Sequence, residues 1–297
     1  MNVRLDVRNM NQKVLVVNDL PGIGKVAGNI NLPILAAAQV EAALLPTLLL
    51  SSYASGQGQV VRHFLEDDFQ AMLGHWAEIE VPFALCLTGY FADSQQIQIL
   101  QTDYEKRKAE NPETLLVVDP IMGDLGKFYK GFDQEVADQM VKFIGSADVV
   151  MPNVTEACLM TGYPYRDDLS FTEIKEIAGE LLKTGVQHVV ITGAHAEVGD
   201  EIGFYLLSQN GESDLILHRH YDRRFYGTGD LAGSLVSGYL LKGMSVHDAL
   251  IRTSRMMEKV LETTIERYQG SYDDRRLCFE PLLGELAQEM IALRKGE

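Results

Sequence analysis

Short, continuously apolar runs recur along the sequence and alternate with longer amphipathic stretches. The runs lie at residues 13–19, 44–52, 82–90, 114–120, 147–153 and 188–195. Continuous hydrophobicity of this kind is typical of parallel strands that are covered on both faces. The stretches between them include residues 59–79, 93–110 and 170–185, which have the spacing of amphipathic helices. The sequence therefore predicts an α/β fold with a doubly wound, mostly parallel central sheet flanked by helices on both faces.

The pattern changes in the last third of the chain. Residues 201–209 and 213–221 are two further strand-like runs, and they are joined through Asn210-Gly211, a strong hairpin signal. We expect an antiparallel pair at one edge of the sheet. A long helix at 245–268 and a last helix from about Pro281 should follow.

Composition limits the classes of protein that the chain can belong to. It has 297 residues, of which 46% are hydrophobic and 23% charged, and no stretch resembles a linker. These values favour one globular domain over residues 1–297 with a sizeable core. The formal net charge of -16 argues against a nucleic-acid or anionic-membrane partner, because either surface would need clustered lysine and arginine.

Cysteine usage and hydropathy predict a cytoplasmic location. The three cysteines, Cys86, Cys158 and Cys278, are odd in number and lack the spacing of a metal site, which suits a reducing compartment. Neither a signal peptide nor a membrane-spanning run is apparent in the sequence.

Polar residues gather at the carboxyl ends of the predicted strands, where open α/β sheets bind their ligands. These positions are Asn18 and Asp19, Ser51 and Ser52, Thr88 to Tyr90, Asp119 to Asp124, Asn153 to Glu156, and Thr192 with Gly193. We expect them to meet at one edge of the sheet.

The stretch "RRFYGTGDLAGSLVSGYLLKG", residues 223–243, places Asp230 at the start of an apolar helix rich in small residues. An aspartate there is often only a cap or a partner of the helix dipole. Alternatively, Gly227 and Gly229 let several N–H groups converge on an anion, with Asp230 beside it as a base. The stretch alone is compatible with both interpretations.

Two familiar nucleotide motifs do not fit the first strand and its loop. A P-loop would need glycine at 19 and serine or threonine at 26, where the chain has Asp19 and Val26. Gly22-x-Gly24-x-x-Ala27 is a fair dinucleotide pattern, but the next strand ends in Ser51-Ser52-Tyr53, without an acid for a ribose hydroxyl. A nicotinamide or flavin enzyme is therefore disfavoured.

Carboxylates in two other loops could hold a metal ion. Asp119 and Asp124 lie on a strand end and the turn after it, where they could bind a Mg²⁺ that also contacts phosphate oxygens. Glu156, in the first turn of a short helix, could orient metal-bound water. Turn chemistry and dipole pairing explain the same residues without a metal.

Taken together, "VVDPIMGD", "MPNVTEACLMTG", "VVITG" and "GTGD" before a small-residue helix resemble the ribokinase-like superfamily. Within it, the chain is most similar to the pyridoxal (pyridoxine, pyridoxamine) kinases of vitamin B6 salvage, from about Val14 to about Arg267. The hydroxymethylpyrimidine kinases of thiamin synthesis share these motifs and are the next most similar group. A B6-binding protein without catalysis is an alternative of another class.

The resemblance implies phosphoryl transfer from ATP to a hydroxymethyl group, with Mg²⁺, a B6 vitamer as acceptor, a homodimeric assembly and a monovalent cation such as K⁺ as a further candidate. It implies that Asp230 takes the proton of the attacking hydroxyl and that Gly227, Thr228 and Gly229 form an anion hole. The remaining implied roles are Mg²⁺ binding by Asp119, Asp124 and Glu156; nucleotide contacts by Asn153, Glu156, Thr192, Gly193, Tyr129 and Val236; and ring contacts by Asp19, Ser51 and Tyr90.

The chain departs from the family pattern at three places. Met151 stands where a threonine is frequent, Ser51-Ser52-Tyr53-Ala54 replaces a Ser-Asn-His-Thr sequence, and Asp19 replaces a serine. A carboxylate at 19 could accept a hydrogen bond from a ring hydroxyl or a protonated ring nitrogen.

Overall fold

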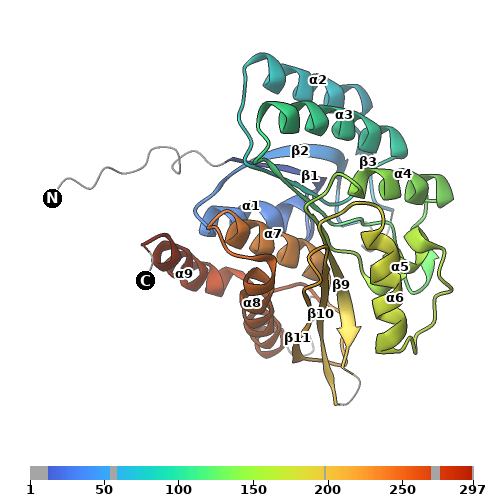
Figure 1. The fold of residues 1–297 in the computed structure, drawn as a ribbon. Coiled ribbons are helices and arrows are strands. Elements are labelled where there is room, and N and C mark those ends of the chain that lie inside the picture. Colours follow the sequence, from blue (N-terminus) through green and yellow to red (C-terminus); the bar gives the residue numbers. More distant parts are fainter. Residues whose placement is uncertain (1–12, 54–58, 197–198, 269–274, 296–297) are drawn as a thin grey trace.

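A central sheet organises the computed structural model, which describes residues 13–53, 59–196, 199–268 and 275–295 (Figure 1). Nine strands of this part of the chain form the sheet, in the order β11-β10-β9-β8-β5-β4-β1-β2-β3. The parallel strands are β1 (Lys13–Pro21), β2 (Glu41–Leu50), β4 (Leu85–Thr88), β5 (Leu115–Val118), β8 (Val149–Val150) and β9 (His188–His195). The predicted α/β fold with a mostly parallel sheet is confirmed.

Antiparallel strands close both edges of the sheet. At one edge β10 (Glu201–Ser208) pairs with β9 and with β11 (Ser213–Arg219). The predicted hairpin at Asn210-Gly211 is confirmed, and Gly211 has the positive φ of 87° that this turn requires. At the other edge β3 (Arg62–Phe64) pairs with the end of β2. A separate small ladder joins β6 (Gly123–Asp124) to β7 (Lys127–Phe128).

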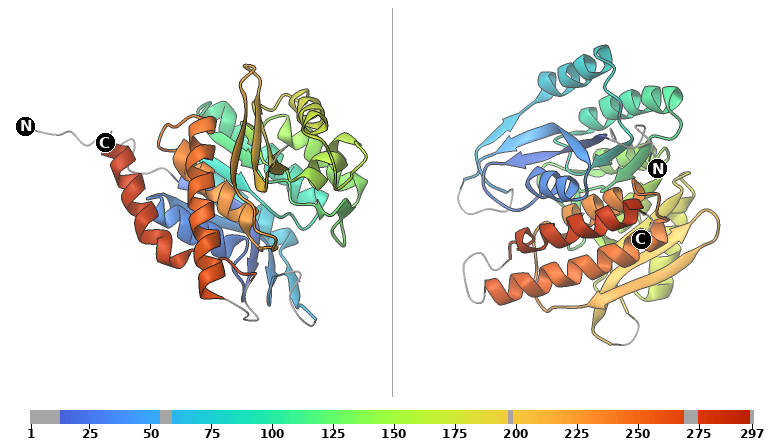
Figure 2. Two further views of the ribbon diagram at one scale, coloured as in Figure 1. Left: turned by 90° about the horizontal axis from the view of Figure 1, so that it is seen from below. Right: turned by 90° about the vertical axis from the view of Figure 1, so that its left-hand side faces the viewer.

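The helices cover the two faces of the sheet in two groups (Figures 1 and 2). One face carries α2 (Glu66–Glu78), α3 (Ser94–Glu110), α4 (Gln134–Ile144), α5 (Val154–Thr161) and α6 (Phe171–Leu182). The other face carries α1 (Gly28–Ala37), α7 (Thr228–Leu240), α8 (Val246–Arg267), the short η2 (Glu280–Leu282) and α9 (Leu283–Lys295). This is the doubly wound arrangement that the apolar runs predict.

Side chains of each central strand alternate between these two layers. In β1, Leu15 and Val17 belong to the core under α2 to α6, whereas Val14 and Val16 belong to the core under α1 and α7 to α9. All four are at most 1% exposed. Because both sides of the strand are buried, its sequence is apolar at consecutive positions.

One predicted boundary is wrong. We expected a helix over residues 59–79, but Arg62–Phe64 form β3 and the helix begins only at Glu66. The three strand residues are exposed, yet their backbone pairs with Leu48–Leu50, which a helix in this segment would leave unpaired. None of the helices in the described ranges combines the length and the apolar character needed to cross a membrane.

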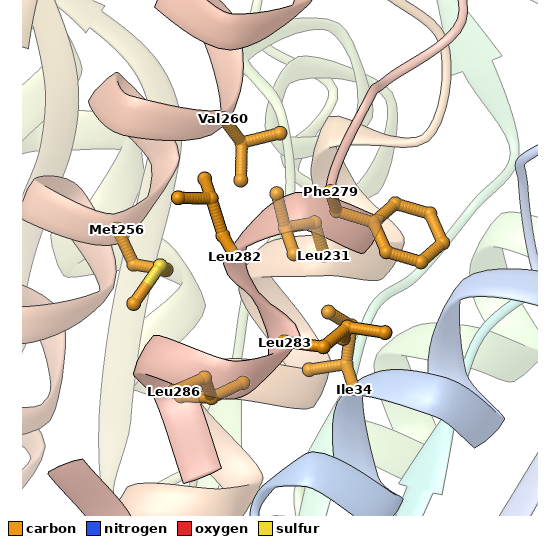
Figure 3. A pocket seen from close by; sticks show the side chains of 8 residues that line it. All are labelled: Ile34, Leu231, Met256, Val260, Phe279, Leu282, Leu283 and Leu286. Carbon is orange, nitrogen blue, oxygen red and sulfur yellow. The ribbon is translucent and has the colours of Figure 1, made fainter. Parts of the chain in front are cut away.

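A small apolar cavity of about 10 Å³ lies where α1, α7, α8 and α9 meet. Figure 3 shows its lining side chains, which are Ile34, Leu231, Met256, Val260, Phe279, Leu282, Leu283 and Leu286. No polar side chain lines it, so a water molecule would find no hydrogen-bond partner among them. On this side α9 is held by apolar packing, while Glu285 and Glu289 on the same helix pair with Lys259 and Arg252 of α8.

Leu286→Ala should lower the free energy of unfolding by about 2–5 kcal/mol, because it enlarges this cavity at a side chain that is only 1% exposed. Ile291→Ala on the same helix, at a side chain that is 42% exposed, is the matched control and should change stability by less than about 0.5 kcal/mol. Denaturant unfolding measures both variants. Equal losses would show that α9 does not depend on this contact.

Candidate active site

The direction of winding reverses at β1. From β1 the chain passes to β2 on one side, then returns across β1 to form β4 on its other side. In open α/β sheets the crevice at the carboxyl ends of such strands is the usual ligand site. The crevice here is formed by Asn18 and Asp19 at the end of β1 and by Thr88, Gly89 and Tyr90 at the end of β4.

The glycine turn before α7 lies against this crevice. Gly227 is the N-cap of α7 and has a left-handed φ of 84°. A Cβ atom at this position would collide with Ile30 and lie 2.7 Å from the Lys25 carbonyl oxygen. At Gly229 it would lie 2.8 Å from Asp119 Oδ2. Both glycines are therefore needed for close packing.

The first turn of α7 has no side-chain cap. The N–H groups at the start of a helix have no partner within the helix, and together with the helix dipole they attract anions. Thr228 and Gly229 stand at this end, and Gly229 is exposed. The expected anion hole at Gly227, Thr228 and Gly229 stays a prediction.

Asp230 does not cap its own helix. Its Oδ2 accepts a hydrogen bond from the Ala27 N–H at 2.8 Å, and its Oδ1 accepts one from Asn18 Nδ2 at 3.0 Å. Burial raises the pKa of Asp230, and these two hydrogen bonds oppose that increase. Of the two interpretations of the sequence, the structure disfavours the simple cap.

Two further acids lie behind Asp230. Asp119, at the end of β5, is 9% exposed, and its pKa is well above the ordinary range because of burial and repulsion from Glu156 and Asp230. Glu156 is 3% exposed, and burial raises its pKa to about 8. Several carboxyl groups are thus held close together with little solvent around them.

Glu156 also has a structural task. It forms a capping box with Asn153 at the start of α5: its Oε2 accepts from the Asn153 N–H at 2.8 Å, and its own N–H donates to Asn153 Oδ1 at 2.8 Å. Its Oε1 accepts from the Met122 N–H at 3.2 Å. Glu156 therefore connects α5 to the loop after β5, and its expected contact with a metal stays a prediction.

Asp124 is the most accessible of the three expected metal ligands. Its side chain is 49% exposed, and its Oδ2 lies 3.5 Å from a guanidinium nitrogen of Arg224 in the segment before the glycine turn. The pair joins two loops that are 100 residues apart in the sequence. Asp124 and Arg224 therefore lie at the rim of the crevice.

Mg²⁺ fits this set of donors, although the residues do not form a closed cage. In the ranges that the structure describes, no three histidine, cysteine or acidic side chains converge closely enough to hold an ion by themselves. Mg²⁺ is commonly bound by one or two carboxylates, with waters and phosphate oxygens completing its shell. In addition, the Thr88 hydroxyl is 1% exposed, has no hydrogen-bond partner there, and lines a cavity of about 10 Å³ shared with Asp119 and Asp230.

Four of the expected nucleotide residues lie near the carboxylates, whereas Val236 lies elsewhere. Asn153 and Thr192 pair across the ends of β8 and β9, and the Thr192 N–H donates to the Pro152 carbonyl at 2.8 Å. Gly193 follows with a φ of 73° and lies at an irregularity in the pairing of β9 with β10. Tyr129 is 42% exposed, and burial of its hydroxyl together with Glu156 and Asp124 raises its pKa. These four residues surround the carboxylates and stay candidates for phosphate contact.

The expected contact between Val236 and adenine is wrong. Val236 lies in the middle of α7, is 0% exposed and belongs to the core between α7 and the sheet. A side chain fully enclosed by protein cannot contact a nucleotide. The apolar pattern of α7 identified a buried helix but could not separate its core positions from positions facing a ligand.

Asp19 and Tyr90 face each other across the crevice. Burial, followed by repulsion from Asp230, raises the pKa of Asp19 to about 7. Burial and the nearby Asp19 carboxylate also raise the pKa of Tyr90. The Tyr90 ring packs edge-on against Phe132, with ring centroids 5.3 Å apart. The expected contact of these two residues with a small ring stays a prediction.

Ser51 lies further out. It is exposed, and its hydroxyl accepts a hydrogen bond from the Val61 N–H at 3.0 Å. Of the three departures, Met151 is 3% exposed and packs in the core, and Ala54 lies outside the described residues. The role of Ser51 in substrate binding stays a prediction.

Sequence reasoning placed Asn18 at the sheet edge but gave it no role, and it missed Asn31 altogether. Both are at most 2% exposed, and Asn18 Nδ2 donates to Asn31 Oδ1 at 3.0 Å. The signal for Asn31 was an amide inside the segment "NINLPILAA", in which Asn29 is the only other polar residue. Buried amides of this kind need partners, and those partners come from α7 some 200 residues later.

Comparisons with known proteins agree with this fold. The model of the phosphomethylpyrimidine kinase family matches residues 59–273. A pyridoxal kinase of Aliivibrio fischeri is 28% identical over 197 residues, and the match spans 63% of this chain and 65% of that relative, just under two thirds of its length.

Two solved structures are similar over nearly the whole chain. The pyridoxal kinase of Lactobacillus plantarum is 32% identical with a TM-score of 0.84, covering 96% of this chain and 99% of its own. A Bacteroides thetaiotaomicron protein, provisionally assigned as a phosphomethylpyrimidine kinase and crystallised with pyridoxal, is 29% identical with a TM-score of 0.85, covering 95% and 96%.

The raised pKa of Asp19 predicts that stability depends on pH. Between its ordinary pKa of 3.8 and about 7, the folded state retains a proton that the unfolded state has lost. Stability from this group is therefore complete below about pH 4 and is lost as the pH rises through about 7. Glu156, with its pKa of about 8, acts in the same direction.

Asp19→Asn should reduce this loss and should make the protein more stable at pH 8 than the unmodified chain, by on the order of 2 kcal/mol. Denaturant unfolding at pH 5 and pH 8 measures the difference, with the exposed Asp67→Asn as control. If Asp19→Asn and the unmodified chain lose the same stability between the two pH values, Asp19 is not a buried acid of this kind.

Proposed function

Since the chain belongs to the phosphomethylpyrimidine kinase family, we propose that it transfers the terminal phosphoryl group of ATP to the hydroxymethyl group of a B6 vitamer, namely pyridoxal, pyridoxamine or pyridoxine. The observation that carries the proposal is Asp230 beside the uncapped start of α7, at the crevice where the winding of the sheet reverses. The pyridoxal bound to the Bacteroides relative supports this choice of acceptor.

The proposed reaction needs a base at the acceptor hydroxyl and positive electrostatic potential at the transferred phosphoryl group. Asp230 accepts the proton of the acceptor hydroxyl while that oxygen bonds to the terminal phosphorus of ATP and the bond to the leaving ADP oxygen breaks. The free N–H groups at residues 227–229 and the dipole of α7 stabilise charge on the transferred group. Most of the catalysis then comes from positioning and electrostatics, as expected for phosphoryl transfer.

Asp119 and Asp124 are the residues that would hold Mg²⁺, with Glu156 behind them. When bound, Mg²⁺ neutralises phosphate charge and orients the phosphate oxygens. Arg224 at the rim is placed to follow the phosphates once Asp124 has another partner. Because buried carboxyl groups would otherwise repel the phosphates of ATP, the site depends on such neutralisation.

At the acceptor side, Asp19 and Tyr90 would contact the ring. A carboxyl group with a pKa of about 7 can exchange between donor and acceptor states near neutral pH. It can therefore bind a ring hydroxyl or a protonated ring nitrogen. Hydroxymethylpyrimidine is the second candidate acceptor, because the family to which the chain belongs is named for kinases of a substituted methylpyrimidine.

The expected homodimer, cytoplasmic location and use of a monovalent cation such as K⁺ stay predictions.

ADP release with MgATP and a panel of pyridoxal, pyridoxamine, pyridoxine and hydroxymethylpyrimidine tests the function. We expect turnover with a B6 vitamer, and a decrease of about 10²–10⁴-fold in Asp230→Asn, which removes the base while keeping the shape of the side chain. Preferred turnover of the pyrimidine would move the chain to the second candidate. Binding of a vitamer without any turnover would favour a B6-binding protein, and full activity of Asp230→Asn would refute the assignment of the base.

Asp124→Ala should raise the Mg²⁺ concentration needed for half-maximal activity by about tenfold, with little change in vitamer binding, because Asp124 is the exposed carboxylate at the rim. Glu113→Ala, an exposed acid before β5 at the opposite edge of the sheet, is the matched control. Magnesium titrations of the steady-state rate measure both. Identical titration curves for Asp124→Ala and the control would exclude a metal role for Asp124.

A further inference from the structure

The side chain of Asn18 uses its full capacity for hydrogen bonds. Its Nδ2 donates to Asn31 Oδ1 and to Asp230 Oδ1, both at 3.0 Å. Its Oδ1 accepts from the N–H of Asp19 at 3.0 Å and from the N–H of Tyr90 at 2.9 Å. A primary amide has two donor hydrogens and two acceptor lone pairs, so no capacity is left over.

These four bonds fix the orientation of the amide. Two backbone N–H groups require the oxygen of Asn18 on the substrate side, so its nitrogen must face Asp230 and Asn31. Asn31 is held in turn, because its Nδ2 donates to Ser234 Oγ at 2.9 Å and to the Asp230 carbonyl at 3.3 Å. A donor aimed at a carboxylate oxygen favours the ionised acid, which is the form a base needs.

The neighbouring strand leaves room for this side chain only because residue 89 is glycine. A Cβ atom there would lie 2.5 Å from Asn18 Nδ2 and 2.6 Å from its Cγ. Asn18 is 2% exposed and bonded on all sides, so it could not move aside without losing hydrogen bonds. The position of the Asn18 amide therefore depends on the absence of a side chain at Gly89.

Resting on the proposed function, we propose that Asn18, accommodated by Gly89, is the positioning residue that keeps Asp230 oriented and ionised and couples it to the backbone of Asp19 and Tyr90 beside the acceptor ring. Asn18 does not touch the reacting atoms. It acts through Asp230. Because Asn18 is also hydrogen-bonded to the N–H groups of Asp19 and Tyr90, it holds the Asp230 carboxylate at a fixed position relative to the acceptor ring.

The surroundings of Asp230 give such a donor a function. Asp19 faces Asp230 from β1, and Asp119 faces it from the end of β5 with Glu156 behind. Burial favours the protonated, inactive form of Asp230, and the Ala27 N–H and the Asn18 amide oppose that effect.

Asn18→Asp removes the donor: the new carboxylate still accepts the N–H bonds of Asp19 and Tyr90, but it loses the bond to Asn31 and gives Asp230 an acceptor of like charge. We expect kcat/KM with pyridoxal to fall about tenfold or more at neutral pH. The acid limb of the pH profile should move up by about one pH unit or more, and the KM for MgATP should stay the same. An unshifted acid limb would overturn the proposal, even if the rate falls.

Gly89→Ala is the second variant, and it removes no polar group from the protein. Its added Cβ should displace Asn18 and shift the acid limb in the same direction. Ser237→Ala is the matched control, because Ser237 lies on the same helix, is 0% exposed, and its hydroxyl has no hydrogen-bond partner among the described residues. Its acid limb should stay where it is in the unmodified chain. A shift as large in Ser237→Ala as in Gly89→Ala would show general loosening and would overturn the proposal.

A measurement without substrate separates this proposal from the proposed function. Carboxyl ¹³C NMR of the ligand-free full chain, with the Asp230 signal assigned through Asp230→Asn, follows protonation of Asp230 directly. Its midpoint should rise in Asn18→Asp and in Gly89→Ala relative to the unmodified chain. An unchanged midpoint in both variants overturns the role of Asn18 whatever the enzyme phosphorylates, whereas a rise in a chain without kinase activity would refute only the function.

Discussion

Four carboxyl groups, Asp19, Asp119, Glu156 and Asp230, are gathered at one end of the sheet with little water around them. Burial raises the pKa of each, and the acids repel one another. Such an arrangement opposes folding unless other groups compensate. In this chain the compensation comes from backbone N–H groups, one amide and the start of α7, all at the carboxyl ends of the strands.

This constraint explains several features that look unrelated in the sequence. Gly229 lets α7 approach Asp119, and the capping box of α5 supplies N–H groups to Glu156. Asn18 does the same for Asp230. Some negative charge at the site stays uncompensated by these groups. The proposed kinase activity depends on this charge, because a cation that enters together with the phosphates is stabilised most where buried negative charge is in excess.

The fold could be predicted well from the sequence because its signals are local. Continuous apolar runs reflect strands with two buried faces, and Asn210-Gly211 permits a tight turn whatever surrounds it. The start of α2 could not be predicted, because pairing of Arg62–Phe64 with β2 is a distant contact. For the same reason Val236 was misassigned: its burial depends on the opposing sheet.

The pairing of α1 with α7 also has a consequence for biosynthesis. The Asp230 carboxylate is held by Ala27 and Asn18, which precede it by 203 and 212 residues. A nascent chain that has released its first 200 residues can form several strands and helices but does not yet contain Asp230, which completes the crevice. Since domains are made from the N-terminus onward, the crevice is completed in one late step, when α7 docks beside α1 on the same face of the sheet. Until then, one N–H of the Asn18 amide and the N–H groups of the Asn31 amide lack the partners that α7 supplies.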